Sequence, residues 1–172
     1  VLDRNEKVSY FDNKTITSIK SELSKYDLNT IPETYSLYKA ISKFHKTQTK
    51  NIYITQGITE CMQQIMFSCV KQNEEVILMD PSYPMYEVLC KLNNIKFKLW
   101  KFNKNFQLKI EDLKKLITKK TRILFLVNPN LPIEYEFDKK IKKAISKICN
   151  KKNILIVYDE AYHHFGAKSE VN

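Results

Sequence analysis

The sequence has very little glycine, with Gly57 and Gly166 as the two glycines among its 172 residues. Glycine-rich phosphate loops need several glycines at fixed spacing, because the backbone must wrap closely around the phosphates. Neither glycine lies in a G-x-x-x-x-G-K-[ST] or a G-x-G-x-x-G pattern. The sequence therefore argues against P-loop ATPases and against dinucleotide-binding Rossmann enzymes.

Long apolar runs are also absent. They stop at about five residues, whereas a membrane helix needs roughly 20. The N-terminal segment VLDRNEKVSY carries charges and has no apolar core of a secretory signal. We expect a soluble, cytoplasmic protein, and a start at Val1 suggests a piece of a longer chain.

Cysteine spacing excludes two further classes. Cys61, Cys69, Cys90 and Cys149 form no C-x-x-C pair, so zinc ribbons and disulfide scaffolds are not indicated. We expect reduced, partly buried thiols. The adjacent pair His163 and His164 lacks a spaced partner, and no metal site is predicted.

The net charge of +10 comes from lysine, which raises the possibility of nucleic-acid binding. Residues 138–149 test that possibility. Their apolar residues recur at i, i+3, i+4 and i+7 and so lie on one helical face, with the lysines on the other; these residues are Ile141, Ala144, Ile145 and Ile148. The pattern favours a solvated lysine face, and we expect neither a nucleic-acid nor a membrane partner.

Helical and strand patterns alternate along most of the chain. Helices are predicted at 15–26, 36–45, 57–70, 84–92, 110–117 and 138–149, and strands at 51–55, 75–79, 96–100, 122–127 and 153–158. Such alternation favours right-handed βαβ crossovers. We predict an α/β fold with a mainly parallel, doubly wound sheet. An N-terminal helical segment, 1–50, would precede a partial large domain, 51–172.

Chemistry-bearing residues follow the strands. The stretch ILIVYDEAY, 154–162, sets two carboxylates and a tyrosine behind an apolar run. That run is typical of a parallel strand covered on both faces. Ligands bind at the carboxyl ends of such strands, so Asp159 is a candidate site residue. A helix-capping Asp159 is the alternative, and the stretch alone leaves both interpretations open.

Three other strand ends carry compatible features. The segment TQGITE places Gly57, Ile58 and Thr59 at a strand-to-helix turn, where free amides and a hydroxyl suit a phosphate. Tyr83 in DPSYPMY offers a ring for stacking, and NPNLP supplies Asn128 and Asn130 in a proline-constrained turn. Together they describe a phosphate cup, a stacking ring and an acid for a cationic ring nitrogen.

These stretches, GITE, DPSYPMYEV, NPNLP and YDEAY, resemble the large domain of the fold-type I pyridoxal-phosphate aminotransferases of class I/II. The similarity is strongest to the histidinol-phosphate aminotransferase branch. It implies that Asp159 pairs with the pyridinium nitrogen, while Tyr162 hydrogen-bonds the phenolic oxygen. It further implies that Tyr83 stacks on the ring, that Ile58 and Thr59 bind the phosphate, and that Glu160 is structural.

The resemblance also implies an activity. We expect a pyridoxal 5′-phosphate-dependent transaminase of amino-acid biosynthesis, a homodimer that acts on an amino donor and a 2-oxo acid. The Schiff-base lysine of the family would lie beyond Asn172, so this chain should be inactive alone. A non-catalytic binding or assembly protein, or a decarboxylase or lyase of the same fold, is the alternative.

The sequence departs from the family in the turn NPNLPIE, where relatives read N-P-x-N-P-T-G. Leu131 stands in place of the asparagine that hydrogen-bonds the phenolic oxygen, and Ile133 and Glu134 replace threonine and glycine. An unpaired oxygen would cost roughly 1 to 3 kcal/mol. These departures predict an altered site and favour the non-catalytic alternative.

Overall fold

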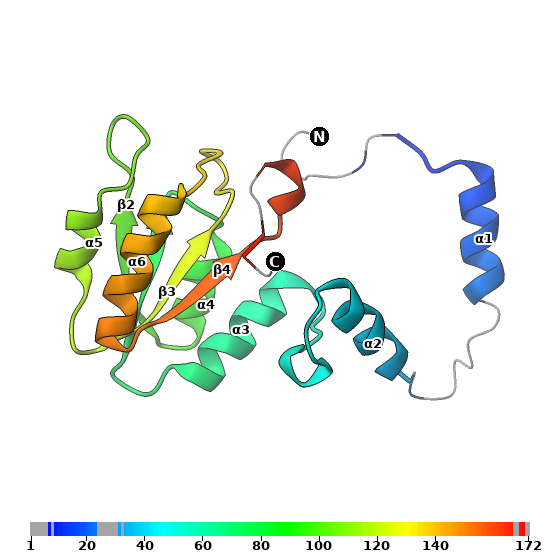
Figure 1. Ribbon diagram of the computed structural model, residues 1–172, viewed down its shortest axis with the longest axis horizontal. Helices are drawn as coiled ribbons and strands as arrows, with labels where there is room; N and C mark the ends of the chain where they lie inside the picture. The colour runs from blue at the N-terminus through cyan, green and yellow to red at the C-terminus, as the bar shows by residue number, and fades with distance from the viewer. Residues whose placement is uncertain (1–6, 8, 24–30, 32, 167–168, 171–172) are drawn as a thin grey trace. The chain divides into compact units, whose positions relative to one another are not determined.

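The computed structural model describes residues 7, 9–23, 31, 33–166 and 169–170. The chain divides into two compact units, Val1–Ile52 and Tyr53–Asn172 (Figure 1). The predicted domain boundary at residue 50 lies close to this division. The assignment of the first unit as the N-terminal segment of a larger domain stays a prediction.

The first unit is helical where it is described. It contains α1 (Asn13–Leu23), α2 (Tyr35–Phe44) and the 3-10 helix η1 (Thr49–Asn51). Asp12 caps α1 by accepting hydrogen bonds from the backbone nitrogen (2.9 Å) and the hydroxyl (2.8 Å) of Thr15, and these bonds lower the pKa of Asp12. Both predicted helices are confirmed, with residues 24–26 of the first lying outside the described part.

The strand predicted at 51–55 is wrong. Asn51 ends η1, and no strand is assigned to the residues that follow it. A β-strand is stabilised by hydrogen bonds to a neighbour, and the strands in the described part of the chain pair with one another. Local β-propensity alone does not form a strand here.

The second unit is built on a four-stranded sheet. Its strands are β1 (Glu75–Asp80), β2 (Lys96–Lys101), β3 (Thr121–Val127) and β4 (Leu155–Asp159). They lie in the order β2-β1-β3-β4 and every pair is parallel. The predicted parallel α/β fold is therefore confirmed.

Helices cover both faces of this sheet: α3 (Gly57–Cys69), α4 (Met85–Leu92), α5 (Ile110–Leu116) and α6 (Lys139–Lys152). The chain moves from β1 to β2 in one direction across the sheet, and from β2 through β3 to β4 in the other. Right-handed crossovers then place α4 on one face and both α5 and α6 on the other, as Figure 1 shows.

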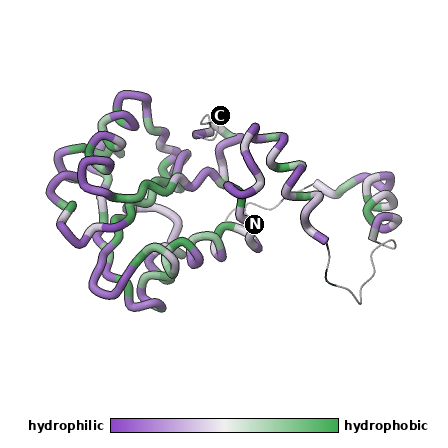
Figure 2. Tube along the Cα trace, turned by 60° about the horizontal axis from the view of Figure 1, so that its bottom comes forward, coloured by the Kyte–Doolittle hydropathy of each residue, from purple (hydrophilic) through white to green (hydrophobic). Residues whose placement is uncertain are grey.

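The core lies between the sheet and these helices. Hydrophobic residues gather toward the middle of this unit, and hydrophilic ones predominate around its outside (Figure 2). Side chains with less than 2% of their surface exposed include Met62, Met66, Trp100, Leu113, Phe125 and Ile145. This packing fixes the strand ends that carry the candidate site.

Burial of β4 differs from the prediction. Leu155 is 42% exposed, and the three residues after it are only partly buried, although full cover on both faces was expected. Among the residues that the structure describes, this strand is the last in the sheet and has one neighbour, β3. Complete cover is found instead on β3, where every residue but Arg122 is buried.

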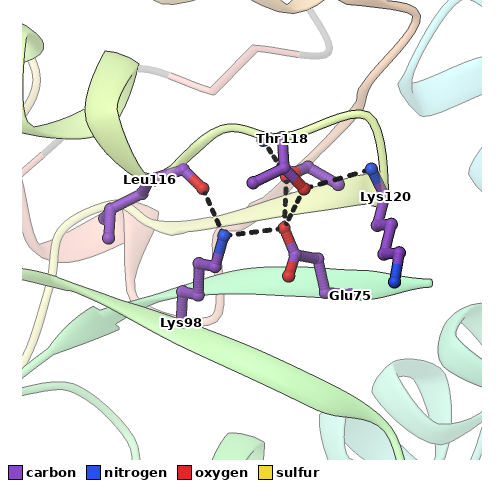
Figure 3. A network of polar contacts seen from close by, with 6 residues as sticks. Glu75, Lys98, Leu116, Thr118 and Lys120 are labelled. Carbon is purple, nitrogen blue, oxygen red and sulfur yellow. Dashed lines mark hydrogen bonds and ion pairs between the residues drawn. The ribbon is translucent and has the colours of Figure 1, made fainter. Parts of the chain in front are cut away.

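A polar network occupies the amino ends of the strands. Glu75 is 8% exposed, and its Oε1 accepts hydrogen bonds from Lys98 Nζ (2.9 Å), Thr118 Oγ1 (2.6 Å) and Thr121 Oγ1 (2.9 Å). Figure 3 shows Lys98 held in addition by the carbonyl of Leu116. Burial by itself raises the pKa of Glu75, but these hydrogen bonds and the lysine charge outweigh it and lower the pKa.

Helix α6 confirms the two faces read from the sequence. Its N-cap, Asp138, accepts a hydrogen bond from the backbone of Ile141 (2.8 Å), and Ile145 is fully buried. Lys139, Lys140 and Lys143 are exposed, while Lys142 forms an ion pair with Glu170. Lys139, Lys140 and Lys143 thus lie on the solvated side of the helix, whereas Lys142 is partly buried.

Candidate functional site

The carboxyl ends of β1 and β3 flank the point where the chain's direction across the sheet reverses. From β1 the chain crosses to β2, whereas from β3 it crosses to β4 on the opposite side. The connections therefore leave the two strand ends in opposite directions. Ligands of parallel α/β sheets bind at such switch points, and the predicted site residues lie in turns and helices around this one.

Asp159 is the last residue of β4 and is 5% exposed. Its Oδ2 accepts a hydrogen bond from the hydroxyl of Tyr86 (2.7 Å), and its Oδ1 accepts one from the backbone nitrogen of Ala161 (3.0 Å). Both donors are neutral. Within the described part of the chain no lysine, arginine or histidine forms an ion pair with this carboxylate.

Buried carboxylates are normally paired with a cation or a metal, because burying an isolated charge is costly. Each oxygen of Asp159 retains a lone pair for a further donor. A group of at least three His, Cys, Asp or Glu side chains that could hold a metal ion is not found among the described residues. The carboxylate is thus arranged to receive a cationic N–H group.

Tyr86 was not predicted from the sequence. It lies in α4, is 2% exposed, and packs its ring on Phe125 with 5.0 Å between centroids. Burial, and next the charge of Asp159, raises its pKa well above the usual value. Tyr86 therefore keeps its proton and donates to Asp159. Its place three residues after Tyr83, just inside α4, was the available sequence signal.

The first turn of α3 contains the predicted phosphate residues. Gly57 begins the helix with φ of +83°, a left-handed conformation that favours glycine. Ile58 packs against the core, so only its backbone amide is suited to an anion, while Thr59 is half-buried. The carboxylate of Glu60 accepts a hydrogen bond from the backbone nitrogen of Gln56 (2.6 Å).

This turn lies near Asp159. Burial raises the pKa of the Cys61 thiol, and the charge of Asp159 raises it further despite a hydrogen bond with Thr55. The charge of Asp159 thus acts on a thiol near the start of α3.

Tyr83 lies in the turn between β1 and α4 and is 41% exposed. Its ring meets Tyr86 edge to face, with 6.5 Å between centroids. Tyr86 in turn donates to Asp159, so Tyr83 belongs to the same cluster. An exposed ring beside a buried acid is suited to a flat ligand that carries a cationic nitrogen.

Tyr162 lies three residues beyond Asp159, where the chain leaves the sheet. It is half-buried, and its ring is 6.3 Å from that of Phe165. Glu160 braces this segment by accepting hydrogen bonds from the hydroxyl of Ser169 and the backbone nitrogen of Glu170, both at 2.6 Å. These contacts agree with a structural part for Glu160.

The turn after β3 keeps a defined backbone despite its unusual sequence. Asn130 and Tyr135 form an isolated antiparallel bridge with hydrogen bonds of 2.9 and 3.2 Å. Inside it, Glu134 has φ of +56°, a left-handed conformation that costs a non-glycine residue roughly 1 to 2 kcal/mol. Leu131 is half-buried and brings no hydrogen-bonding side chain.

Asn128 is buried on the other face of the sheet. Its Oδ1 accepts a hydrogen bond from the backbone of Phe137 (3.2 Å), whose ring packs near Trp100. Its Nδ2 has no partner among the described residues. Because Phe137 precedes α6 and Tyr86 belongs to α4, this amide points away from Asp159.

A cavity of about 400 Å³ lies elsewhere, lined by residues 70–74 and 93–96 at the amino ends of β1 and β2. No predicted site residue lines it. In the described part of the chain, no helix is both long and apolar enough to cross a membrane.

Residues 9–171 match the family of aminotransferases of class I and II. A histidinol-phosphate aminotransferase from Bacteroides thetaiotaomicron is 28% identical over 78% of this chain and 38% of its own length. The structure of N-succinyldiaminopimelate aminotransferase from Mycobacterium tuberculosis has a TM-score of 0.81 at 20% identity, over 94% of this chain and 45% of its own. Cystalysin from Treponema denticola, solved with a pyridoxal 5′-phosphate cofactor, has a TM-score of 0.76 at 19% identity, over 87% and 40%.

The chain thus spans less than half the length of these relatives. Similarity to the solved structures agrees with the parallel α/β fold, and the family match extends from α1 through the turn after β4. The chain belongs to the class I and II aminotransferase family.

Proposed function

We propose that the full-length protein is a pyridoxal 5′-phosphate-dependent aminotransferase. It would move an amino group between a donor, an amino acid or an amino phosphate such as histidinol phosphate, and a 2-oxo acid. The observation that carries the proposal is Asp159, a buried carboxylate at the carboxyl edge of a parallel sheet that no cation among the described residues neutralises. A protonated pyridine nitrogen would supply the missing positive charge.

The described residues fit this cofactor at several points. Asp159 would hold the pyridine nitrogen protonated, and Tyr86 would hold Asp159 in place. Tyr83 would stack on the ring, and Tyr162 would donate to its phenolic oxygen. The phosphate would lie at the first turn of α3, where the amide of Ile58 and the hydroxyl of Thr59 are available and the helix dipole favours an anion.

The cofactor, when bound, supplies an electron sink for the carbanion of the substrate. The chain's own residues bind and orient it. The lysine that would move the proton is expected outside this chain, as the family resemblance implies. The 172-residue chain should therefore show weak, reversible cofactor binding and no turnover.

The turn after β3 favours a second candidate, a non-catalytic relative with a binding or assembly function. Leu131 offers no donor to the phenolic oxygen, and Glu134 keeps a strained backbone in place of glycine. A pyridoxal-phosphate decarboxylase or lyase on the same fold is the third alternative. Product analysis with several amino acids would separate it from a transaminase.

Cofactor titration of the full-length protein distinguishes the first two. A transaminase should develop the visible absorbance of the bound cofactor, and the Asp159→Ala variant should lack this absorbance. The wild-type protein should also show turnover with glutamate and 2-oxoglutarate. A protein that shows no spectral change, and none that depends on Asp159, would support the non-catalytic alternative. Turnover by the isolated chain above a control with free cofactor would show that the catalytic lysine has been misplaced.

We further propose a cytoplasmic homodimer with a part in amino-acid biosynthesis. Family membership supports this, because the resemblance implies a homodimer whose active sites lie at the subunit boundary. Sedimentation of the cofactor-loaded full-length protein at micromolar concentration should give a dimer. A monomer that retains turnover would contradict the dimer.

A further inference from the structure

A buried carboxamide joins the two strand ends at the switch point. Asn130 is fully buried. Its Nδ2 donates to the carbonyl of Pro81 (3.0 Å), and its Oδ1 accepts from the hydroxyl of Ser82 (2.6 Å). These two bonds link the turn after β3 with the turn after β1.

The orientation of this carboxamide is fixed by its partners. A carbonyl oxygen only accepts hydrogen bonds, so the amide nitrogen must face Pro81 and the amide oxygen must face Ser82. The backbone of Asn130 is held as well, through its bridge to Tyr135. The ring of Tyr135 packs on Phe102 at 5.2 Å and on Phe137 at 5.0 Å.

Tyr83, by contrast, directly follows Ser82 and has little to hold its ring. It is 41% exposed, and its ring partner among the described residues is Tyr86, met by its edge. One side chain thus holds the turn before Tyr83 at the backbone carbonyl of Pro81 and at the side-chain hydroxyl of Ser82. The direction in which the ring leaves the turn therefore depends on Asn130.

We propose that Asn130 is a positioning residue that sets the plane of the Tyr83 ring for the cofactor ring. This rests on the proposed function, in which Tyr83 stacks on pyridoxal phosphate. Asparagine suits the position because it donates to one group and accepts from the other without a charge. Aspartate would accept from Ser82 but would set a negative oxygen against the Pro81 carbonyl.

The test uses the full-length protein and four variants: Asn130→Asp, Ser82→Ala, Tyr83→Ala and Asn130→Asp/Tyr83→Ala. Pyridoxal phosphate is titrated by fluorescence, and the induced circular dichroism of the bound cofactor reports the orientation of its ring. Asn103→Ala is the matched control. Its Oδ1 also braces a turn at the carboxyl edge, through the backbone nitrogens of Asn105 and Gln107, but that turn carries no proposed site residue.

Asn130→Asp should weaken cofactor binding about five- to ten-fold, and Ser82→Ala about two- to five-fold, the range for loss of one or two hydrogen bonds. Both should change the induced circular dichroism, which Asn103→Ala should leave unchanged. In the Tyr83→Ala background, Asn130→Asp should cause no further loss of affinity.

Two outcomes would overturn the inference. One is full additivity of Asn130→Asp and Tyr83→Ala, and the other is normal cofactor affinity and circular dichroism in Ser82→Ala. Failure of the proposed function looks different, because Tyr83→Ala alone would then leave cofactor affinity unchanged. If Asn130→Asp fails to fold, Ser82→Ala carries the same test.

Discussion

The amino ends and the carboxyl ends of the strands form two opposite edges of the sheet. Each of these edges buries a carboxylate, but the two charges have different partners. At the amino edge, one oxygen of Glu75 accepts from two hydroxyls and from the ammonium group of Lys98. At the carboxyl edge, Asp159 accepts only from the neutral Tyr86 and Ala161 in the described part of the chain. The amino edge is complete by itself, whereas the carboxyl edge keeps a charge available for a ligand.

Backbone strain follows the same division. Turns at the amino edge place asparagine in the left-handed conformation, at Asn73, Asn94 and Asn153, where a short polar side chain lowers the cost. Turns at the carboxyl edge place Phe106 and Glu134 in that conformation. Near the proposed site, Glu134 therefore carries a larger cost of this conformation than the asparagines at the amino edge do.

Substitution of Asp159 should have the largest effect. In the full-length protein, Asp159→Asn should weaken cofactor binding about a hundred-fold or more, because removing one partner of a buried ion pair costs about 3 kcal/mol or more. The cofactor-free variant should be at least as stable as the wild type, since an uncompensated charge is removed. Absorbance titration and urea unfolding measure the two quantities.

Asp159→Glu serves as its control, because it keeps the charge and moves the carboxylate. Unchanged cofactor affinity in Asp159→Asn would remove the distinction between the two edges. Destabilisation of its cofactor-free form would mean that Asp159 is a structural residue like Glu75.

Glu75→Gln should show the opposite pattern. We expect the free energy of unfolding to fall by about 1 to 3 kcal/mol, because Lys98 loses its anion and a hydroxyl loses its acceptor. Cofactor affinity should not change. Equal effects of Glu75→Gln and Asp159→Asn on cofactor binding would show that the edges are not independent.

Tyr86→Phe removes the hydroxyl that holds Asp159 and keeps the ring. Affinity for the cofactor should fall about five-fold, the effect of losing one hydrogen bond of about 1 kcal/mol. Tyr38→Phe, in the first unit, is a control of the same chemistry. An unchanged affinity would show that the strand end alone orients the carboxylate.

Glu134→Gly should stabilise the protein by up to about 1 kcal/mol. Glycine adopts the left-handed conformation without a steric penalty, and the greater flexibility of the unfolded chain with glycine offsets part of that gain. Asn153→Gly, at the C-cap of α6, should give a smaller change. Urea unfolding midpoints compare the two. A larger gain at Asn153 would contradict the unequal strain of the two edges.

The smallest expected effect is the change in stability at acidic pH. Hydrogen bonds and Lys98 lower the pKa of Glu75 below its ordinary value of 4.5, so its network stabilises the fold above that pH. The contribution is lost as the pH falls through the lowered pKa. The stability difference between wild type and Glu75→Gln should therefore shrink between about pH 6 and pH 3. A difference that stays constant over this range would contradict a charged Glu75.

The fold followed from periodicity because most elements carry their signal locally. Residues 123–127 are apolar throughout and are buried, and the repeat in residues 138–149 gave the buried side of α6. The wrong predictions concern which strands have neighbours in the sheet. Residues 51–55 have a strand-like composition without a strand beside them, and β4 is an edge strand that its own sequence cannot reveal.

The site was only partly accessible from the sequence. Asp159 could be found from the charge that ends an apolar strand, and Gly57 from its rarity. The hydrogen bond from Tyr86 to Asp159 could not be found from the sequence, because these two residues are 73 positions apart. The amide of Asn130 was noticed as part of a motif, but its partners in the turn after β1 are a product of the strand order.

The distance in sequence between Tyr86 and Asp159 has a consequence for folding while the chain is being synthesised. Closing a longer loop of chain costs more conformational entropy, and distant contacts form later in folding. The Glu75 network spans at most 46 positions and is complete once Thr121 is made, while Tyr86 must wait for Asp159. A nascent chain at the ribosome should therefore secure one edge of the sheet early, and should gain its affinity for a cofactor only after β4 has emerged.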